Sequence, residues 1–279
     1  MSRVTHLRHI TASLLPLTRS KTIHFSPLFA LSTVVGFDKV ATKPNIFIQL
    51  AAQFQDVTTG KLAFDKIFTG LKGVDWDNGG IWRTTAPQVQ FYNGKAYDCY
   101  YYLNDAWYKD AEGKDAYKPG WSDAAGSYVD LTATPGQGFW FVNPSEEAEE
   151  ICGAGQVEES SEAVVEVPGG AFAILANIFP MSVNLNDAKH VVADGIVGVD
   201  WDNGGVWRDT ATQIQLFNGK NYDCYYYLND GWYKDAEGKE SYKPGWCDAA
   251  GSIVDAIIPA QQSFWIIART GKFTFTFKR

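Results

Sequence analysis

The chain has 279 residues, enough for about two domains that each bury a core of their own. Its net charge is −8, but residues 1–45 hold six Lys/Arg and one acid, which leaves 18 basic and 31 acidic residues, a net −13, for residues 46–279. A body this acidic repels phosphate backbones, which argues against nucleic acid as the main partner. No apolar run approaches the roughly twenty residues of a transmembrane helix, so we expect no transmembrane segment.

Residues 1–35 differ in composition from the rest of the chain. Several basic residues precede the apolar stretch Phe25 to Phe37, acids are absent, and Ser and Thr are frequent. This composition is typical of a secretory or other targeting segment and predicts a secreted or cell-surface protein. Pro16 and Pro27 interrupt the apolar runs, so an ordinary N-terminus stays open as the alternative.

A block of residues occurs twice in the chain without insertion or deletion. Gly73–Val142 and Gly198–Ile267 lie 125 positions apart and match at roughly 70% of positions. A period of this length is about the size of a small domain. We therefore predict two homologous units, 36–145 and 163–279, joined by an acidic linker over 146–162.

Each unit is expected to be all-β. An apolar strand opens each unit, at 46–54 and at 171–179, and short alternating runs follow, separated by turn pairs such as Asn-Gly and Pro-Gly. The least strand-like segments, 56–71 and 181–196, leave room for a short helical turn. The sequence thus predicts two tandem homologous antiparallel β-sandwich or barrel-like units with short helical turns. Lys272–Phe277 is typical of a final strand, which we expect at a sheet edge.

The hairpin around Asn93-Gly94 decides which side chains face solvent. A two-residue Asn-Gly loop would set Asp98 opposite Val89 and place a carboxylate on the apolar face. A three-residue loop with a left-handed Gly94 sets Val89 opposite Tyr97 instead, and we expect this register.

With that register, tyrosines, carboxamides and a carboxylate share the solvent face beside a tryptophan. Aromatic faces pack against the C–H groups of sugars while polar neighbours bind the hydroxyls. The expected ligand-binding residues are Gln88, Gln90, Asp98, Tyr100, Tyr102 and Trp107, with Gln213, Gln215, Asp223, Tyr225, Tyr227 and Trp232 in the second unit. The expected function is non-catalytic binding or adhesion, and the expected partner is a glycan or surface polymer. The alternative partner is a further copy of the chain, in a surface layer or filament.

Tryptophans have two possible roles in a small β domain. They are often part of the core, with the indole N–H bonded internally, but they also serve as platforms for sugar rings. We expect Trp82, Trp121 and Trp140 in the core. Trp76 and Trp107 sit beside polar turns, and both roles stay open for them.

The repeated string VDWDNGG resembles an acidic calcium loop. Its hard oxygens come from Asp75, Asp77 and Asn78, and in the second unit from Asp200, Asp202 and Asn203. The string departs from the EF-hand pattern, because Gly79 and Ala86 stand where ligands are needed. A turn in which Asp77 accepts local amide hydrogen bonds is the interpretation we favour. We expect no cofactor other than this possible calcium ion.

The four cysteines allow two interpretations. In an exported protein, Cys224–Cys247 and Cys99–Cys152 are the economical pairs among three connectivities. Four reduced, partly buried thiols are the alternative.

Catalytic patterns are few. No histidine recurs at equivalent positions of the two units, which excludes a Ser/His or Cys/His mechanism in each. A carboxylate pair built from Glu112 with Asp98 or Asp115 keeps a carbohydrate-active hydrolase as a further hypothesis.

The second unit also carries a resemblance. The strings FAILANIFPMSVNLND, DCYYYLNDGWY, SYKPGW and QQSFWII follow one another in the order seen in duplicated aromatic-rich β modules of uncharacterised exported bacterial proteins. The likeness covers most of residues 46–279. It implies a secreted or surface protein and supplies no ligand, activity or catalytic residue.

Overall fold

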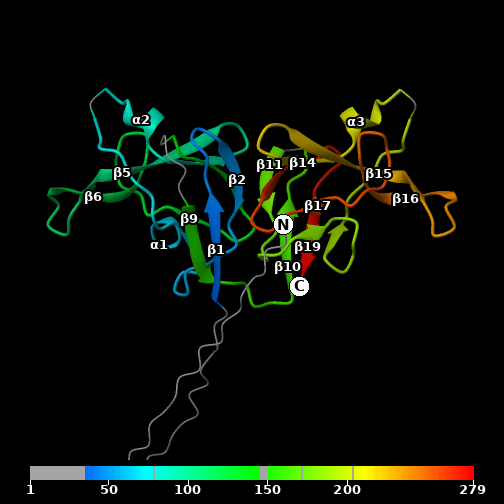
Figure 1. Cartoon of the computed structure of the whole chain (residues 1–279), viewed down its shortest axis with the longest axis horizontal. Helices are drawn as coiled ribbons and strands as arrows, with labels where there is room; N and C mark the ends of the chain where they lie inside the picture. The colour runs from blue at the N-terminus through cyan, green and yellow to red at the C-terminus, as the bar shows by residue number, and fades with distance from the viewer. Residues whose placement is uncertain (1–34, 78, 145–149, 171, 203) are drawn as a thin grey trace, which may run out of the picture.

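The computed structural model describes residues 35–77, 79–144, 150–170, 172–202 and 204–279. Its regular structure is almost entirely β, with three one-turn helices, so the predicted all-β class is confirmed. Figure 1 shows two halves side by side, with a two-stranded arm projecting outward from each. The predicted targeting segment lies outside the described residues, apart from Val35.

The first half contains, in chain order, β1 (Val35–Ala41), β2 (Phe47–Ala51), β3 (Leu62–Ala63), α1 (Phe64–Ile67), α2 (Trp82–Thr85), β4 (Gln88–Tyr92), β5 (Tyr97–Lys109), β6 (Asp115–Ser122), β7 (Thr132–Ala133), β8 (Gly138–Val142) and β9 (Glu150–Gln156). The second half contains β10 (Glu162–Val167), β11 (Phe172–Ala176), β12 (Val183–Asn184), β13 (Val191–Asp194), α3 (Trp207–Thr210), β14 (Gln213–Phe217), β15 (Tyr222–Lys234), β16 (Glu240–Cys247), β17 (Ile257–Ile258), β18 (Ser263–Ile267) and β19 (Phe273–Lys278).

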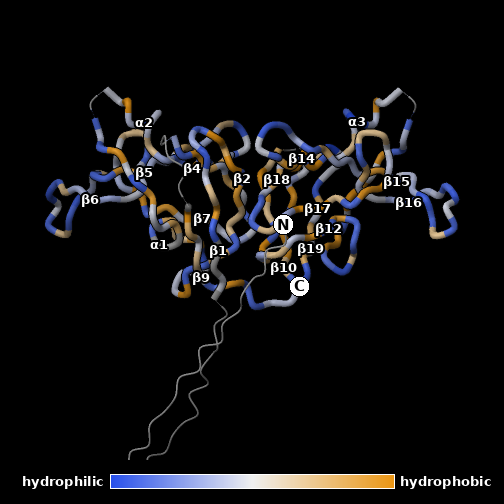
Figure 2. Tube along the Cα trace, viewed as in Figure 1, coloured by the Kyte–Doolittle hydropathy of each residue, from blue (hydrophilic) through white to orange (hydrophobic). Residues whose placement is uncertain are grey.

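Each half is built on a five-stranded antiparallel sheet. The strand order is β2-β8-β4-β5-β6 in the first half and β11-β18-β14-β15-β16 in the second. The two orders correspond strand for strand, as the sequence repeat requires. Each sheet has one long strand, β5 in the first half and β15 in the second. A bulge interrupts the pairing of β5 with β6 and of β15 with β16. Beyond the bulge these hairpins form the outward arms, whose turns are hydrophilic (Figure 2).

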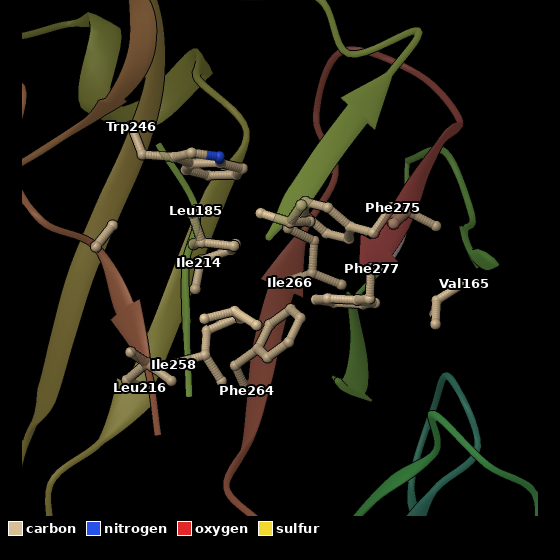
Figure 3. Close-up of a cluster of buried hydrophobic side chains, with 14 of the residues drawn as sticks. Val165, Leu185, Ile214, Leu216, Trp246, Ile258, Phe264, Ile266, Phe275 and Phe277 are labelled. Atoms are coloured by element: carbon tan, nitrogen blue, oxygen red, sulfur yellow. The ribbon is translucent and has the colours of Figure 1, made fainter. Parts of the chain in front are cut away.

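A smaller sheet covers one face of each large sheet. In the second half it has the order β10-β19-β13, so β19 is a central strand, and the expectation that it lies at a sheet edge is wrong. Its Phe273, Phe275 and Phe277 are buried, and they alternate with threonines as a strand with one covered face requires. Phe275 and Phe277 point toward the large sheet, where Phe264 and Ile266 of β18 lie (Figure 3).

The corresponding layer of the first half uses part of the expected linker. Glu150–Gln156 form β9, which pairs antiparallel with β1 along its whole length, instead of a solvated segment. Ile151 is buried in the first core, in the same cluster as Phe64 and Leu131. The strand forms because β1 supplies backbone partners and a covered face, although its own sequence begins within an acidic run.

The two halves meet through contacts that repeat with the 125-residue period. Leu50 bridges to Gln262, and its counterpart Leu175 bridges to Gln137. The ring pair Tyr92–Trp265, with centroids 4.9 Å apart, has as its counterpart Phe217–Trp140 at 5.2 Å. The interface is therefore isologous, like that of a two-fold dimer, although both sides belong to one chain.

Gln53 marks the centre of this interface. Its carboxamide Nε2 donates to the carbonyls of Asn177 and Phe179, each over 2.9 Å. The residue between these two carbonyls is Ile178, the counterpart of Gln53 itself.

All four cysteines are free thiols, which agrees with the reduced alternative and not with the disulfide pairs. Cys247 is fully buried, and burial raises the pKa of its thiol to about 12, with smaller contributions from Asp248 and Asp230. Within the described residues, no helix has the length and apolar character needed to cross a membrane.

Candidate functional site

The hairpin between β4 and β5 closes through a two-residue turn. The backbone N–H of Asn93 donates to the carbonyl of Ala96 over 3.0 Å, and Gly94, which follows Asn93, has a φ of +93°. The side-chain oxygen of Asn93 accepts the N–H groups of Lys95 and Ala96, at 3.1 and 2.9 Å. Asn93 is thus the first of the four residues of this β-turn, where its side chain bonds the backbone ahead. The two central residues are Gly94 and Lys95.

The resulting register corrects the expected pairing. Val89 lies opposite Tyr100, not Tyr97, so the three-residue loop is wrong. In the second half, Ile214 lies opposite Tyr225 through the same turn. Opposite residues of an antiparallel pair share a face, so these tyrosines point to the same side as the buried Val89 and Ile214.

The expected binding residues are therefore divided between the two faces of the sheet. Tyr100 and Tyr102 pack half-buried against the first core, and burial raises the pKa of both phenols. The core-side set is Asp98, Tyr100, Tyr102, Asp223, Tyr225 and Tyr227, and the set on the opposite face is Gln88, Gln90, Gln213 and Gln215. The sheet brings no single surface together from these ten residues.

The first two carboxamides also bond within the protein. Gln88 Nε2 donates to the carbonyl of Arg83 over 2.7 Å, and Gln90 Nε2 donates to Gln88 Oε1 over 3.1 Å. Asp98 accepts from Asn93 Nδ2 over 3.0 Å at the exposed turn. These side chains support the hairpin and the α2 loop.

The tryptophans differ in exposure. Trp82, Trp121 and Trp140 are buried, as predicted. Trp76 and its counterpart Trp201 are 43% and 42% exposed, the most exposed tryptophans among the described residues. Half of a large apolar ring thus faces water at the same place in both halves.

Trp76 is held from two sides. Its backbone N–H donates to Asp105 Oδ1 over 2.8 Å, which ties its loop to β5. Its ring lies on Gly126, where an added Cβ would sit 2.5 Å from Cδ1 of the indole. Gly126 has a φ of +87° in a turn whose N–H groups at Ala125 and Ser127 donate to Asp123 Oδ1. Glycine is therefore required here both by backbone conformation and by the ring above it.

Arg83 of α2 braces the same turn. Its Nε and Nη2 donate to the carbonyl of Ala124 over 2.9 and 2.7 Å. Its guanidinium carbon lies 4.8 Å from the ring centroid of the buried Trp82. The loop that carries Trp76 is thereby fixed to the turn that supports the ring.

Trp107 and Tyr117 lie on the arm, which is joined to this turn by a backbone hydrogen bond. The N–H of Trp107 donates to the carbonyl of Gly126 over 3.0 Å, and Trp107 pairs with Tyr117 across the arm. Tyr117 is 65% exposed. Lys109 Nζ lies 5.4 Å from the Trp107 ring centroid and forms an ion pair with Asp115. That hydrogen bond holds the pKa of Asp115 below its usual range, although desolvation acts in the opposite direction.

We call Trp76, Trp107, Tyr117 and Gly126 the first platform, and Trp201, Trp232, Tyr242 and Gly251 the second platform. The second repeats the first closely: Trp201 N–H donates to Asp230 Oδ1 over 2.8 Å, and a Cβ on Gly251 would sit 2.5 Å from Trp201 Cδ1. Arg208 donates to the Ala249 carbonyl as Arg83 does to Ala124. Of the expected binding residues, Trp107 and Trp232 belong to these platforms.

The acidic loop acts as a turn. Asp77 accepts the N–H groups of Ile81 and Trp82 over 3.3 and 3.1 Å at the start of α2. Desolvation raises the pKa of Asp77, but the backbone donors of Trp82 and its neighbours outweigh it and hold the pKa below its usual range. Asp75 Oδ1 accepts from Asn104 Nδ2 over 2.8 Å.

The second loop uses its acids in the same way. Asp202 accepts the N–H groups of Val206 and Trp207, and Asp200 accepts from Asn229 Nδ2 over 2.8 Å. Asn78 and Asn203 lie outside the described residues. Among those described, no three His, Cys, Asp or Glu side chains gather as a metal site would require.

No family model, curated protein or solved structure matches this chain. Its ligand chemistry has to be inferred from the platforms themselves.

The sequence placed Trp107 and Trp232 in the site and left the role of Trp76 open, but it did not point to the glycine beneath Trp76. A signal was present: the string DAAGS recurs at 123–127 and 248–252, and the tryptophan of VDWDNGG recurs with it. Nothing local shows that the turn and the tryptophan meet, because they are fifty residues apart in the chain.

The positions of the candidate carboxylates do not favour a catalytic pair. Glu112 lies in the exposed turn at the tip of the first arm, whereas Asp98 lies near the opposite end of the thirteen-residue β5. Asp115 is engaged by Lys109. A groove of about 590 Å³ lies between the halves, and none of its lining residues is acidic.

Proposed function

We propose that the protein is a non-catalytic binding or adhesion protein whose two platforms bind carbohydrate. The observation that carries the proposal is the half-exposed indole of Trp76, rigidly supported and repeated as Trp201. An exposed ring fixed on glycine loses little conformational entropy when a ligand covers it. An unsupported surface tryptophan would lose more.

The chemistry around the rings suits sugars. The C–H face of a pyranose packs against an indole, and its hydroxyls need hydrogen-bond acceptors and donors at the rim. An ionised carboxylate has about four acceptor positions. Asp75 and Asp105 flank Trp76, and in the described part of the chain each accepts one side-chain or backbone donor. The remaining positions are available to hydroxyl donors.

The assembly hypothesis loses one of its two supports, the other being the aromatic faces. A terminal strand at a sheet edge would be open to pairing with a neighbouring copy, but β19 lies between β10 and β13. The exposed aliphatic residues Ile81 and Val206, near the platform tryptophans in sequence, suit contact with a glycan and contact with a second copy equally. We therefore favour glycan binding over self-assembly, and sedimentation at micromolar concentration compares the two: a concentration-dependent polymer would favour assembly.

We also propose that the protein acts outside the cell or on its surface. The composition of residues 1–35 supports this location, as does the supply of polymeric glycans there. Detection of the protein in the culture medium or on intact cells would support it, and an exclusively cytoplasmic location would contradict it.

A glycan array probed with the full chain tests the binding proposal. We expect binding by the native protein and loss of about tenfold or more in affinity for the double variant Trp76→Ala/Trp201→Ala. The control is Val57→Ala, which removes an exposed apolar side chain from a turn outside the platforms. Glycan binding that is the same in the double variant and in the control would refute the site.

A further inference from the structure

Each platform is joined by hydrogen bonds to a long strand, β5 or β15, and these two strands leave the shared interface in opposite directions. Tyr97, the first residue of β5, has its ring centroid 6.5 Å from that of Trp265 in the other half. Tyr222, the first residue of β15, packs at 5.4 Å against Phe217, which contacts Trp140 of the first half. Figure 1 shows β5 and β15 running from the centre toward opposite ends of the molecule.

The length of these strands sets the separation of the platforms. Trp107 lies ten residues beyond Tyr97, and Trp232 ten beyond Tyr222. At about 3.4 Å per residue, each strand covers roughly 34 Å, which places the two platforms on the order of 60 Å apart. A glycan of a few sugar units cannot reach from one to the other.

This separation is fixed by the packing between the halves. The bridges Leu50–Gln262 and Leu175–Gln137 join the large sheets directly, and Gln53 bonds two carbonyls of the other half. The halves are therefore a single rigid spacer, unlike modules on a flexible linker, which could fold back on one ligand.

We propose that the protein bridges separate glycan segments, one held at each end, and so cross-links glycan polymers or glycan-coated surfaces. The inference rests on the proposed carbohydrate binding and adds to it the partner: a long or multivalent glycan. Simultaneous engagement at both ends gives avidity on such a ligand without any new contact. On a short free glycan the two ends act independently.

The test uses the glycan that the native protein binds most tightly on the array. It is prepared in two forms, a free oligosaccharide of four units or fewer and a polyacrylamide conjugate carrying many copies. Titration calorimetry with the free form should give two sites per native chain and one site, with unchanged affinity, for Trp76→Ala or Trp201→Ala. With the conjugate, the native protein should precipitate it, measured by turbidity. Each single variant should bind about 100-fold more weakly and leave the solution clear.

The outcomes separate the two proposals. Two sites without precipitation, or precipitation by both single variants as strong as the native protein's, would overturn bridging while leaving carbohydrate binding intact. Absence of binding to every free glycan would overturn both. Sedimentation of each variant must show a monomer, because a dimer of a single variant would itself carry two platforms. Val57→Ala should precipitate the conjugate as the native protein does.

Discussion

Gly231 leaves the space that the thiol of Cys247 fills. A Cβ at position 231 would overlap the Cys247 Sγ and would lie 2.7 Å from Cδ1 of Ile253. The first half has Ala106 and Ser122 at the corresponding positions, both fully buried. The second half thus has a larger atom at position 247, sulfur in place of the Ser122 oxygen, and lacks the methyl group of Ala106 at position 231 on the neighbouring strand.

We predict that Gly231→Ala destabilises the protein by about 1–3 kcal/mol, the usual cost of overpacking a core. Guanidinium unfolding measures the change. The double variant Gly231→Ala/Cys247→Ser restores the pairing of the first half, so its loss should be smaller than the sum of the two single losses by about 0.5 kcal/mol or more. Additive losses would show that the two positions do not share this space.

Gly126 supports Trp76 by lacking a side chain. Gly126→Ala should cost about 1–2 kcal/mol for the positive φ and about 1–3 kcal/mol more for contact with the indole. Displacement of the ring should also increase quenching of tryptophan fluorescence by acrylamide.

Gly113 provides the matched control for that variant. It has a φ of +77° in the turn of the same arm, and an added Cβ would meet nothing within 4 Å. Gly113→Ala should show the backbone cost alone, with unchanged quenching. Equal unfolding losses for the two alanine variants would contradict the support of Trp76 by Gly126.

Substitution by alanine should mainly lower stability at Tyr100 and mainly weaken glycan binding at Trp76. Tyr100→Ala removes a ring from the first core and should destabilise the fold by about 2 kcal/mol, reduced from the full cost because the ring is half-buried. Trp76→Ala should change stability by less than about 1 kcal/mol, yet weaken glycan binding. Chemical unfolding and the glycan array, run on both variants, check the contrast. A stable Tyr100→Ala variant that loses glycan binding would restore the tyrosine face as the site.

The Cys247 thiol links stability to alkaline pH. Its pKa is about 12 in the folded protein and 9.0 as the unperturbed value, because burial disfavours the thiolate. A raised folded pKa stabilises the fold fully below pH 9, and the contribution is lost as pH rises from 9 toward 12. The stability of the native protein relative to Cys247→Ser should therefore fall over that range.

Thiol labelling gives an independent measurement of the same group. At pH 8 Cys247 should react much more slowly with a thiol reagent than Cys152, which is half-buried. The rate at Cys247 should rise on addition of denaturant. Equal rates for the two cysteines in the native protein would contradict the buried, protonated state.

Patterns within each repeat predicted the local structure well. The segment Lys272–Phe277 was predicted to be a final strand, as β19 is, and the turn pairs predicted an all-β chain. The predicted register of the β4–β5 hairpin was wrong because Asn93 suits both the first position and a central position of a turn. Its side chain bonds N–H groups as the first residue, and the preference of Asn-Gly for central positions was the stronger sequence signal.

Pairings between distant segments could not be predicted. β9 becomes a strand through β1, and β19 is central because β10 and β13 flank it, although local sequence shows neither partner. Trp76 and Gly126 meet for the same reason: Asp105 and Trp107 of the long β5 bond the two loops that carry them.

The contact of Gln53 with the residues around Ile178 shows what covalent fusion allows. In a dimer of identical subunits, a residue on the symmetry axis faces its own twin, so every substitution changes both sides at once. Here one side presents an amide and the other a hydrocarbon, and the amide bonds the two carbonyls that border its counterpart. Joining two related modules in one polypeptide frees each to specialise at their common boundary, an option closed to a homodimer.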